Sequence, residues 1–503
     1  MAIVKQKVEL INDVKLENSL GDLKSFIKKS AQDGNSAHDV ESGIWKLVLN
    51  MGRQALGSFF DFCGTGDLGE EIETATGKLQ LIGKNVERVY TTVFGEMKIR
   101  RATYGTRAKQ KIEFVPLDTR LRLPDGRFSY LLQDWDQSFA IENSFNHSRE
   151  IIKKILNVNQ SVDSLERMNQ KMSLDVKKFR EEKKMPDDRD EGKLLVVSAD
   201  GKGVPMKKET LERKIESHQK KGIKKNKKQM AIIGAAYTID PLVRTPEDVI
   251  SSLFSTKKVV GKDGDRPRSK NKHIYGSLSY EENGLTVNAE EKIFGQLQEE
   301  VLLRTSNTPR KALVLMDGQR SLWAQSKRFF PKGSIEILDL LHVTPRIWQT
   351  AHLFNKEGSE EALEFVKKNL LKVLQGKTGN VIKAFRRMGT ERNFKKNKKK
   401  SLNQICNYLS KNKRRLKYNE YLKNGYPIAT GVIEGACRYF VKDRMEGAGM
   451  RWTIDGAQAM LDVRSISINE DWDEFTKFRI KREETRLYPH KKFLKEIAWP
   501  LVA

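Results

Sequence analysis

The chain contains 503 residues, more than one ordinary domain, so about two to four domains are expected. Its 93 lysine and arginine residues exceed its 66 acidic residues, and the net charge of +27 favours a polyanionic partner. Nucleic acid is the first candidate and an anionic membrane surface the second. No apolar run reaches the roughly 18 residues that a spanning helix needs, and the first residues lack the apolar stretch of a signal peptide. We therefore expect a cytoplasmic protein that does not enter a membrane.

Cysteine and histidine form no recognisable metal-binding pattern in this sequence. Cys63, Cys406 and Cys437 are scattered, and the seven histidines include no His-Glu-x-x-His pair. Any metal ligands should therefore be carboxylates, which favour Mg²⁺ or Mn²⁺. No phosphate-binding P-loop is present, and the glycine pattern at 64–69 follows a predicted helix instead of a strand. A nucleotide cofactor is not expected.

The first part of the chain is predicted to be helical and then to form short strands. Apolar periodicity predicts helix over residues 1 to about 75. Turn residues separate three strand-like segments, at 89–94, 97–104 and 111–117. We expect a helical N-terminal region over 1–84 and a small-strand and DNA-binding region over 85–190.

Residues 148–172 have the outline of a helix-turn-helix. Two amphipathic helices flank a polar turn at 157–160, with Ser161 as the expected N-cap of the second helix. If this pair lies on DNA, Lys153 and Lys154 are expected to contact it. Because any helical hairpin has the same outline, DNA binding and plain helical packing both remain open.

A charged linker at 183–193 separates this region from an α/β pattern. Five apolar segments are predicted as strands, at 194–199, 231–239, 273–280, 312–316 and 334–341. Helical sequence follows the third, fourth and fifth of them. This order indicates an α/β fold with a mixed sheet.

The strand pattern stops after the fifth segment. Residues 345–426 are predicted to be an all-helical, strongly basic insertion, and residues 428–445 a further helix. We expect one α/β core made of 191–344 and 427–470, followed by a C-terminal tail over 471–503.

Two aspartates stand at the ends of predicted buried strands. Asp200 follows the strand at 194–199, Asp317 follows the strand at 312–316, and a glycine comes after each. Ligands bind at the carboxyl ends of strands in α/β sheets, so both aspartates are candidate catalytic residues. Asp-Gly also favours tight turns, so a turn role remains open for each.

Phosphodiester chemistry with two metal ions needs a third acid near such a pair, and Glu434 is the candidate. Arg438 and Lys442 follow it at spacings of four residues, so all three share one face of an α-helix. Asp443 would project roughly opposite, and Glu446 lies near the expected helix end. An ordinary Glu–Arg helix pair is the alternative role for Glu434.

Four segments are similar to the ordered motifs of one transposase family. They are VVSADGKGVPM (196–206), LVLMDGQRSLW (313–323), LDLLHVTPRIWQTAHLF (338–354) and YPIATGVIEGACRYFVKDRMEGAGMRWT (426–453). The chain most closely resembles the ISKra group of insertion-sequence DDE transposases, over about residues 85 to 465. Relatives often carry a Cys-x-x-Cys zinc pair after the strand matching 97–104, and this chain lacks it. A zinc ribbon is therefore not expected.

The resemblance implies an RNase H-like catalytic core and a DNA transposase that cuts and joins DNA at terminal inverted repeats. By the family's motifs, Asp200, Asp317 and Glu434 would be the catalytic acids and would hold two Mg²⁺ or Mn²⁺ ions. Asp339 and His342 resemble the Asp-x-x-His element of Mutator-like transposases, which bear a helical insertion before the final glutamate.

The same resemblance implies the partners. Lys202, Arg438 and Lys442 would contact DNA phosphates near the metals. The substrates would be double-stranded transposon ends and target DNA, bound by a homodimer or higher homo-oligomer that is nucleoid-associated on DNA. Two alternatives remain: a hydrolytic nuclease of the same fold, or a non-catalytic DNA-binding descendant of a transposase. All three motif acids are present, which disfavours the second alternative.

Overall fold

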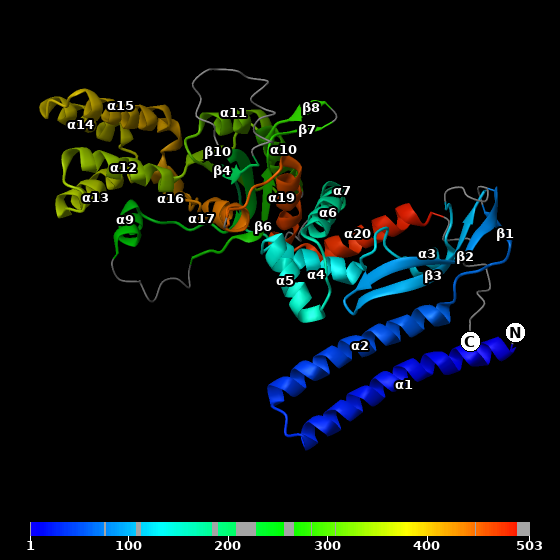
Figure 1. Ribbon diagram of the computed structural model, residues 1–503. Coiled ribbons are helices and arrows are strands. Elements are labelled where there is room, and N and C mark those ends of the chain that lie inside the picture. Colours follow the sequence, from blue (N-terminus) through cyan, green and yellow to red (C-terminus); the bar gives the residue numbers. More distant parts are fainter. Residues whose placement is uncertain are drawn as a thin grey trace. The chain divides into compact units, whose positions relative to one another are not determined.

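The computed structural model describes two compact units. The described residues are 2–74, 77–106, 112–183, 190–207, 228–255, 266–282, 284–306, 308–447 and 449–489. One unit comprises Met1–Asp175 with Asp473–Ala503, and the other comprises Val176–Trp472 (Figure 1). Within the described residues, no helix combines the length and the apolar character needed to span a membrane.

The first unit begins with a pair of long helices and a small antiparallel sheet. Its first elements are α1 (Ala2–Gln32), α2 (Ala37–Cys63), β1 (Glu71–Thr74), β2 (Gly77–Thr92), β3 (Gly95–Gly105) and α3 (Pro116–Leu121). The strand order is β1-β2-β3. The predicted helix therefore ends at Cys63, before the glycines of 64–69, and does not reach residue 75.

The predicted strand at 111–117 is wrong for its described residues. Phe114 makes one isolated bridge to Tyr104, and Pro116 then begins α3. Proline lacks the N–H that a strand donates to its neighbour, and its fixed φ suits the first turn of a helix.

Three helices pack together after this sheet: α4 (Tyr130–Ala140), α5 (Phe145–Leu156) and α6 (Val162–Ser173). The predicted helix pair is confirmed, and Ser161 caps α6 by accepting a hydrogen bond from the backbone N–H of Ser164. Asn157 turns the chain with a φ of 55°. The segment predicted as a C-terminal tail contains α20 (Trp472–Leu487), whose Arg479 donates to Gln133 of α4 at 3.1 Å.

The second unit is built on a mixed five-stranded sheet, so the predicted α/β class is confirmed. Its strands are β4 (Leu194–Pro205), β5 (Lys228–Ile239), β6 (Lys270–Ser277), β9 (Lys311–Met316) and β10 (Ile335–Leu338). Their order is β10-β9-β4-β5-β6; β4 pairs with β9 and β9 with β10 in parallel, and the other two pairings are antiparallel.

Helices cover both faces of this sheet. A Cβ added to Gly234 would meet α10 (Ala289–Ser306), whereas one added to Gly276 would meet Phe440 and Leu461, the latter in α19 (Ile454–Ile468). Gly234 and Gly276 lie on neighbouring strands one register position apart, so they face opposite sides. The unit also contains α7 (Val176–Glu182), α9 (Pro246–Phe254), α11 (Arg320–Phe329) and the hairpin β7 (Tyr280–Glu282) and β8 (Leu285–Val287).

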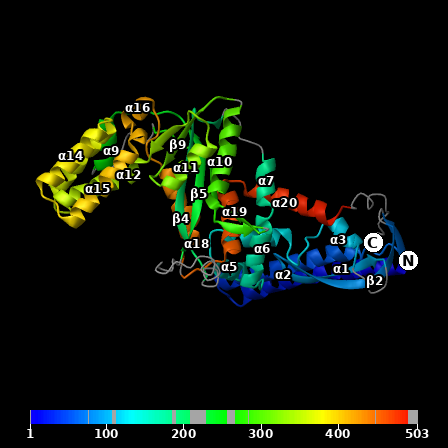
Figure 2. The same ribbon diagram turned by 90° about the horizontal axis from the view of Figure 1, so that it is seen from above.

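The structure describes all residues of the predicted insertion, 345–426, and these residues form helices joined by short connections, with no strand. The insertion is formed by α12 (Leu340–Phe354), α13 (Glu360–Leu374), α14 (Thr378–Glu391), α15 (Lys396–Lys411), η3 (Lys413–Arg415) and α16 (Tyr418–Lys423). Figure 2 shows α12, α14, α15 and α16 gathered into one group. Buried residues of these helices and of the sheet belong to one continuous hydrophobic cluster. The insertion is therefore packed onto the sheet and is not a separate lobe.

A buried charge network joins α10 to β6 in the second unit. Glu300 lies 2.6 Å from both the Nδ1 atom of His273 and the Nε atom of Arg304. Burial opposes ionisation of Glu300, but these two neighbours outweigh it and lower its pKa to about 2. The carboxylate therefore stabilises the fold above its ordinary pKa of 4.5, and this contribution is lost as pH falls toward 2.

We predict that Arg304→Met lowers the free energy of unfolding by about 3–5 kcal/mol, because it removes the arginine partner of a buried carboxylate and leaves only His273 beside it. Urea unfolding at neutral pH measures this change. The matched control is Arg328→Met, which breaks the exposed Arg328–Glu291 pair and should cost less than about 1 kcal/mol. Equal effects of the two substitutions would contradict the prediction.

Candidate active site

The strand register places three aspartates in a row. Paired residues of β4 and β9 end at Val197 and Val314, and Asp200 and Asp317 each lie three residues further on. The backbone N–H of Asp339, directly after β10, donates to the Met316 carbonyl at 2.8 Å. The three aspartates thus stand at one level on β4, β9 and β10, where ligands bind in open α/β sheets.

The turn that was the alternative role for Asp200 is not formed. β4 continues through this residue to Pro205, because its antiparallel ladder with β5 runs to Pro205 and Lys228. The parallel pairing of β4 with β9, in contrast, ends at Val197, before Asp200. Asp317 does leave its strand, and its Oδ1 atom accepts a hydrogen bond of 2.9 Å from the backbone N–H of Gln319.

Asp339 is the most buried of the three aspartates, at 1% exposure. It caps α12, and its Oδ1 atom accepts a 2.8 Å hydrogen bond from the backbone N–H of Leu341. The pKa of Asp339 is raised to about 6, by burial first and also by the charge of Glu434, while the hydrogen bond from Leu341 and the charge of His342 oppose the shift. The proposed auxiliary pair, Asp339 and His342, is therefore close enough to interact electrostatically.

Asp317, like Asp339, lies in an environment that raises the pKa of its carboxyl group. Its pKa is raised by burial first and then by the negative charge of Asp200, while His342 lowers it. The charge of Asp200 acts on Asp317, the charge of Glu434 acts on Asp339, and the strand register places Asp317 beside Asp339. We call these four residues the acid group.

The helix that carries Glu434 is not a regular α-helix. It consists of α17 (Gly431–Ala436), the π-helical turn η4 (Cys437–Lys442) and α18 (Asp443–Met445), and it begins at Gly431, not at residue 428. In η4 the backbone N–H of Asp443 donates to the Arg438 carbonyl, five residues earlier. The face-sharing argument from regular α-helical spacing therefore does not hold here, although Arg438 and Lys442 are both exposed.

Glu434 nevertheless differs from the two rival acids. Asp443 pairs with Arg438 at 4.0 Å, and Glu446 pairs with Lys228 at 3.1 Å. The charge of Glu434 instead acts on Asp339 and on Cys437.

Two residues of the site were not identified from the sequence. The Cys437 thiol donates to Asp200 Oδ2 at 3.4 Å, and burial together with the charge of Asp200 raises the pKa of Cys437. Tyr408, from α15, packs so closely on Gly318 that a Cβ there would lie 2.3 Å from its ring. Nothing in the local sequence marks either residue, because each reaches the site only through folding.

The remaining predicted DNA contacts lie on different parts of the structure. Lys202 is half-buried on β4. Its charge acts on Cys437 and opposes the upward shift of the Cys437 pKa. Lys153 and Lys154 are exposed on α5, in the other compact unit.

The acid group has suitable donors for a hard divalent ion but does not form a coordination sphere. Among the residues that the structure describes, no three His, Cys, Asp or Glu side chains are grouped so as to hold a metal ion. Carboxylates are the ligands that Mg²⁺ and Mn²⁺ prefer. The chemistry of the donors therefore fits such an ion, and their side chains would have to converge to bind it.

Comparison with known proteins identifies no relative. The chain matches no family model, and no curated protein matches it. The resemblance to transposases therefore depends on the sequence motifs alone.

We predict that Asp339→Asn raises the free energy of unfolding by about 2–3 kcal/mol at pH 8. The substitution keeps the helix cap and removes a charge whose folded-state pKa is raised to about 6. The stabilising effect of the protonated Asp339 is complete below about pH 4 and is lost as pH rises through 6, so the gain should vanish near pH 4. Urea unfolding at several pH values measures it.

The matched control is Asp443→Asn, which removes an exposed carboxylate. It should change the unfolding free energy by less than about 0.5 kcal/mol at either pH. A gain from Asp339→Asn that does not depend on pH would contradict the burial argument.

Proposed function

We propose that this protein is a DDE-type DNA transposase that cuts and joins DNA with divalent metal ions. The observation that carries the proposal is the row of Asp200, Asp317 and Asp339 on adjacent parallel strands, with Glu434 in electrostatic reach. An RNase H-like identity for the core is part of the proposal. The similarity of the four sequence motifs to the ISKra group supports it.

The electrostatics of the acid group favour binding of a cation. Burial raises the pKa values of Asp317 and Asp339, and the charges of Asp200 and Glu434, respectively, add to the shift, so the ionised forms of both aspartates are disfavoured. A positive charge shared among the carboxylates would favour those ionised forms. Divalent ions held by Asp200, Asp317 and Glu434 would activate an attacking oxygen and stabilise the leaving one.

The protein's own groups would position the DNA. Lys202, Arg438 and Lys442 would neutralise phosphates beside the acids, and His342 would orient Asp339 through its charge. The net charge of +27 supports a nucleic-acid partner. Because transposition joins two element ends to a target, a homodimer or higher homo-oligomer is part of the proposal.

A hydrolytic nuclease is the second candidate, since the same acids would serve cutting without joining. Precleaved element ends distinguish the two functions: a transposase joins their 3′-hydroxyls to target DNA, and a nuclease does not.

We predict that Asp200→Asn and Asp317→Asn each reduce cleavage of DNA carrying the element's inverted repeats by roughly a thousandfold. Loss of a metal-binding carboxylate removes several kcal/mol of transition-state stabilisation. DNA binding should change little, because the phosphate contacts remain. Gel-based cleavage in Mg²⁺ and in Mn²⁺, with a parallel binding titration, measures both properties.

Glu434→Gln should behave like these variants, and Asp443→Asn is its matched control on the same helix. The control substitution keeps the helix and removes only the carboxylate that pairs with Arg438. An active Glu434→Gln enzyme beside an inactive Asp443→Asn enzyme would overturn the choice of third acid.

We also propose that α5 and α6 recognise the element ends. Reversing the two exposed charges, Lys153→Glu and Lys154→Glu, should weaken binding of end DNA by about tenfold or more. The matched control is Lys28→Glu with Lys29→Glu, an adjacent exposed lysine pair on α1, which should leave the affinity within about twofold of the wild type. Unchanged affinity in the double variant, with its helical content retained, would contradict the prediction and indicate that α5 and α6 only pack against other helices.

A further inference from the structure

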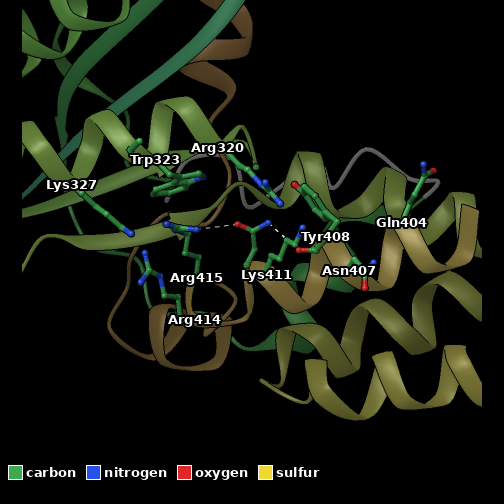
Figure 3. Close-up of a pocket in the computed structure, with 12 residues that line it drawn as sticks. Arg320, Trp323, Lys327, Gln404, Asn407, Tyr408, Lys411, Arg414 and Arg415 are labelled. Carbon is green, nitrogen blue, oxygen red and sulfur yellow. Dashed lines mark hydrogen bonds between the residues drawn. The ribbon is translucent and has the colours of Figure 1, made fainter. Parts of the chain in front are cut away.

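A basic pocket lies between α11 of the core and α15–η3 of the insertion. Its volume is about 800 Å³, and its charged lining residues are all cations: Arg320, Lys327, Lys411, Arg414 and Arg415. No acidic side chain is among the described residues that line it. Figure 3 shows the charged ends of these five cations directed into the space between the helices.

Two of the cations are held in place by the surrounding fold. Arg415 is 6% exposed, pairs with Glu336 at 2.8 Å, and lies 3.9 Å from the ring centroid of Trp323. Arg414 pairs with the same glutamate at 3.1 Å. These contacts fix the floor of the basic pocket and partly neutralise it.

The other three cations have no such compensation. Arg320, Lys327 and Lys411 are exposed, and among the described residues none of them forms an ion pair. Three like charges around one concave space repel one another unless an anion is shared between them. The basic pocket therefore has the charge arrangement of a phosphate-binding site.

The basic pocket adjoins the acid group. Gly318, which directly follows Asp317, lines the pocket together with Tyr408. Burial and then the charge of Asp317 raise the pKa of Tyr408 to about 12, so the ring and the aspartate are close. A DNA strand that passes Asp317 would reach the pocket next.

We propose that the basic pocket binds an unpaired segment of the DNA strand next to the bond that the acid group cleaves. This inference rests on the proposed function. A volume of about 800 Å³ is typical of small-ligand sites, so it suits a short single-stranded segment better than a duplex. The amides of Gln404 and Asn407 also line the pocket and can bond to base edges that pairing would conceal.

The test compares single-stranded and duplex DNA binding by the full-length protein. The probe is a fluorescein-labelled oligothymidine of about twelve nucleotides, within the usual range of single-strand sites. The pocket variant is Arg320→Ala with Lys327→Ala and Lys411→Ala. The matched control removes three exposed lysines of the insertion that do not line the pocket: Lys356→Ala with Lys383→Ala and Lys423→Ala.

For the pocket variant we expect oligothymidine affinity to fall by about tenfold or more, with end-duplex affinity changed by less than about threefold. The slope of log affinity against log salt should become shallower by about 2, since each phosphate contact on a single strand contributes about 0.7. The control should bind oligothymidine within about twofold of the wild type. Oligothymidine binding at the wild-type level in the pocket variant, or an equal loss in the control, would overturn the proposal.

The same preparations separate this proposal from the proposed function. If Asp317→Asn abolishes cleavage while the pocket variant binds oligothymidine normally, only the pocket assignment fails. If Asp317→Asn still cleaves, the catalytic assignment fails, and selective loss of oligothymidine binding still establishes the pocket as a single-strand site.

Discussion

The parallel register of β4, β9 and β10 determines which carboxylates lie together in this protein. Neighbouring strands are about 4.8 Å apart, so residues at one level on three strands cannot avoid each other's charge. Asp200, Asp317 and Asp339 occupy such a level. Burial is the first cause of the raised pKa values of Asp317 and Asp339, and the charges of Asp200 and Glu434 add to it. The continuous core of sheet and insertion stabilises an arrangement that is electrostatically unfavourable by itself.

The insertion is part of the site because it shares this core. The Tyr418 hydroxyl donates to the Leu338 carbonyl at 2.6 Å, directly before Asp339, and Arg415 pairs with Glu336 on the same strand. The short strand β10 is therefore held by the insertion on one side and by β9 on the other. Tyr408 lies against Gly318 as a consequence, and the basic pocket adjoins the acid group.

The sequence predicted those parts of the structure that depend on local patterns. Buried apolar runs identified the five core strands, and apolar periodicity identified the insertion. Prediction from local sequence failed where pairing between distant strands sets the end of a strand. The predicted strand ended at residue 199, but pairing with β5 continues β4 through Asp200 and Gly201, although Asp-Gly favours a turn. The π turn at 437–442 has no sequence signature, and Cys437 and Tyr408 reach the acids through tertiary packing alone.

That π turn also explains why Glu434 is not an ordinary partner of Arg438. In a regular α-helix, residues four apart are neighbours, which would pair Glu434 with Arg438. The wider turn instead brings Arg438 to Asp443, five residues along, at 4.0 Å. Among the described residues Glu434 and Arg438 form no ion pair, so the charge of Glu434 remains uncompensated on its own helix. It acts on Asp339 and Cys437 instead, which makes Glu434 the acid of this helix that belongs with the strand-end aspartates.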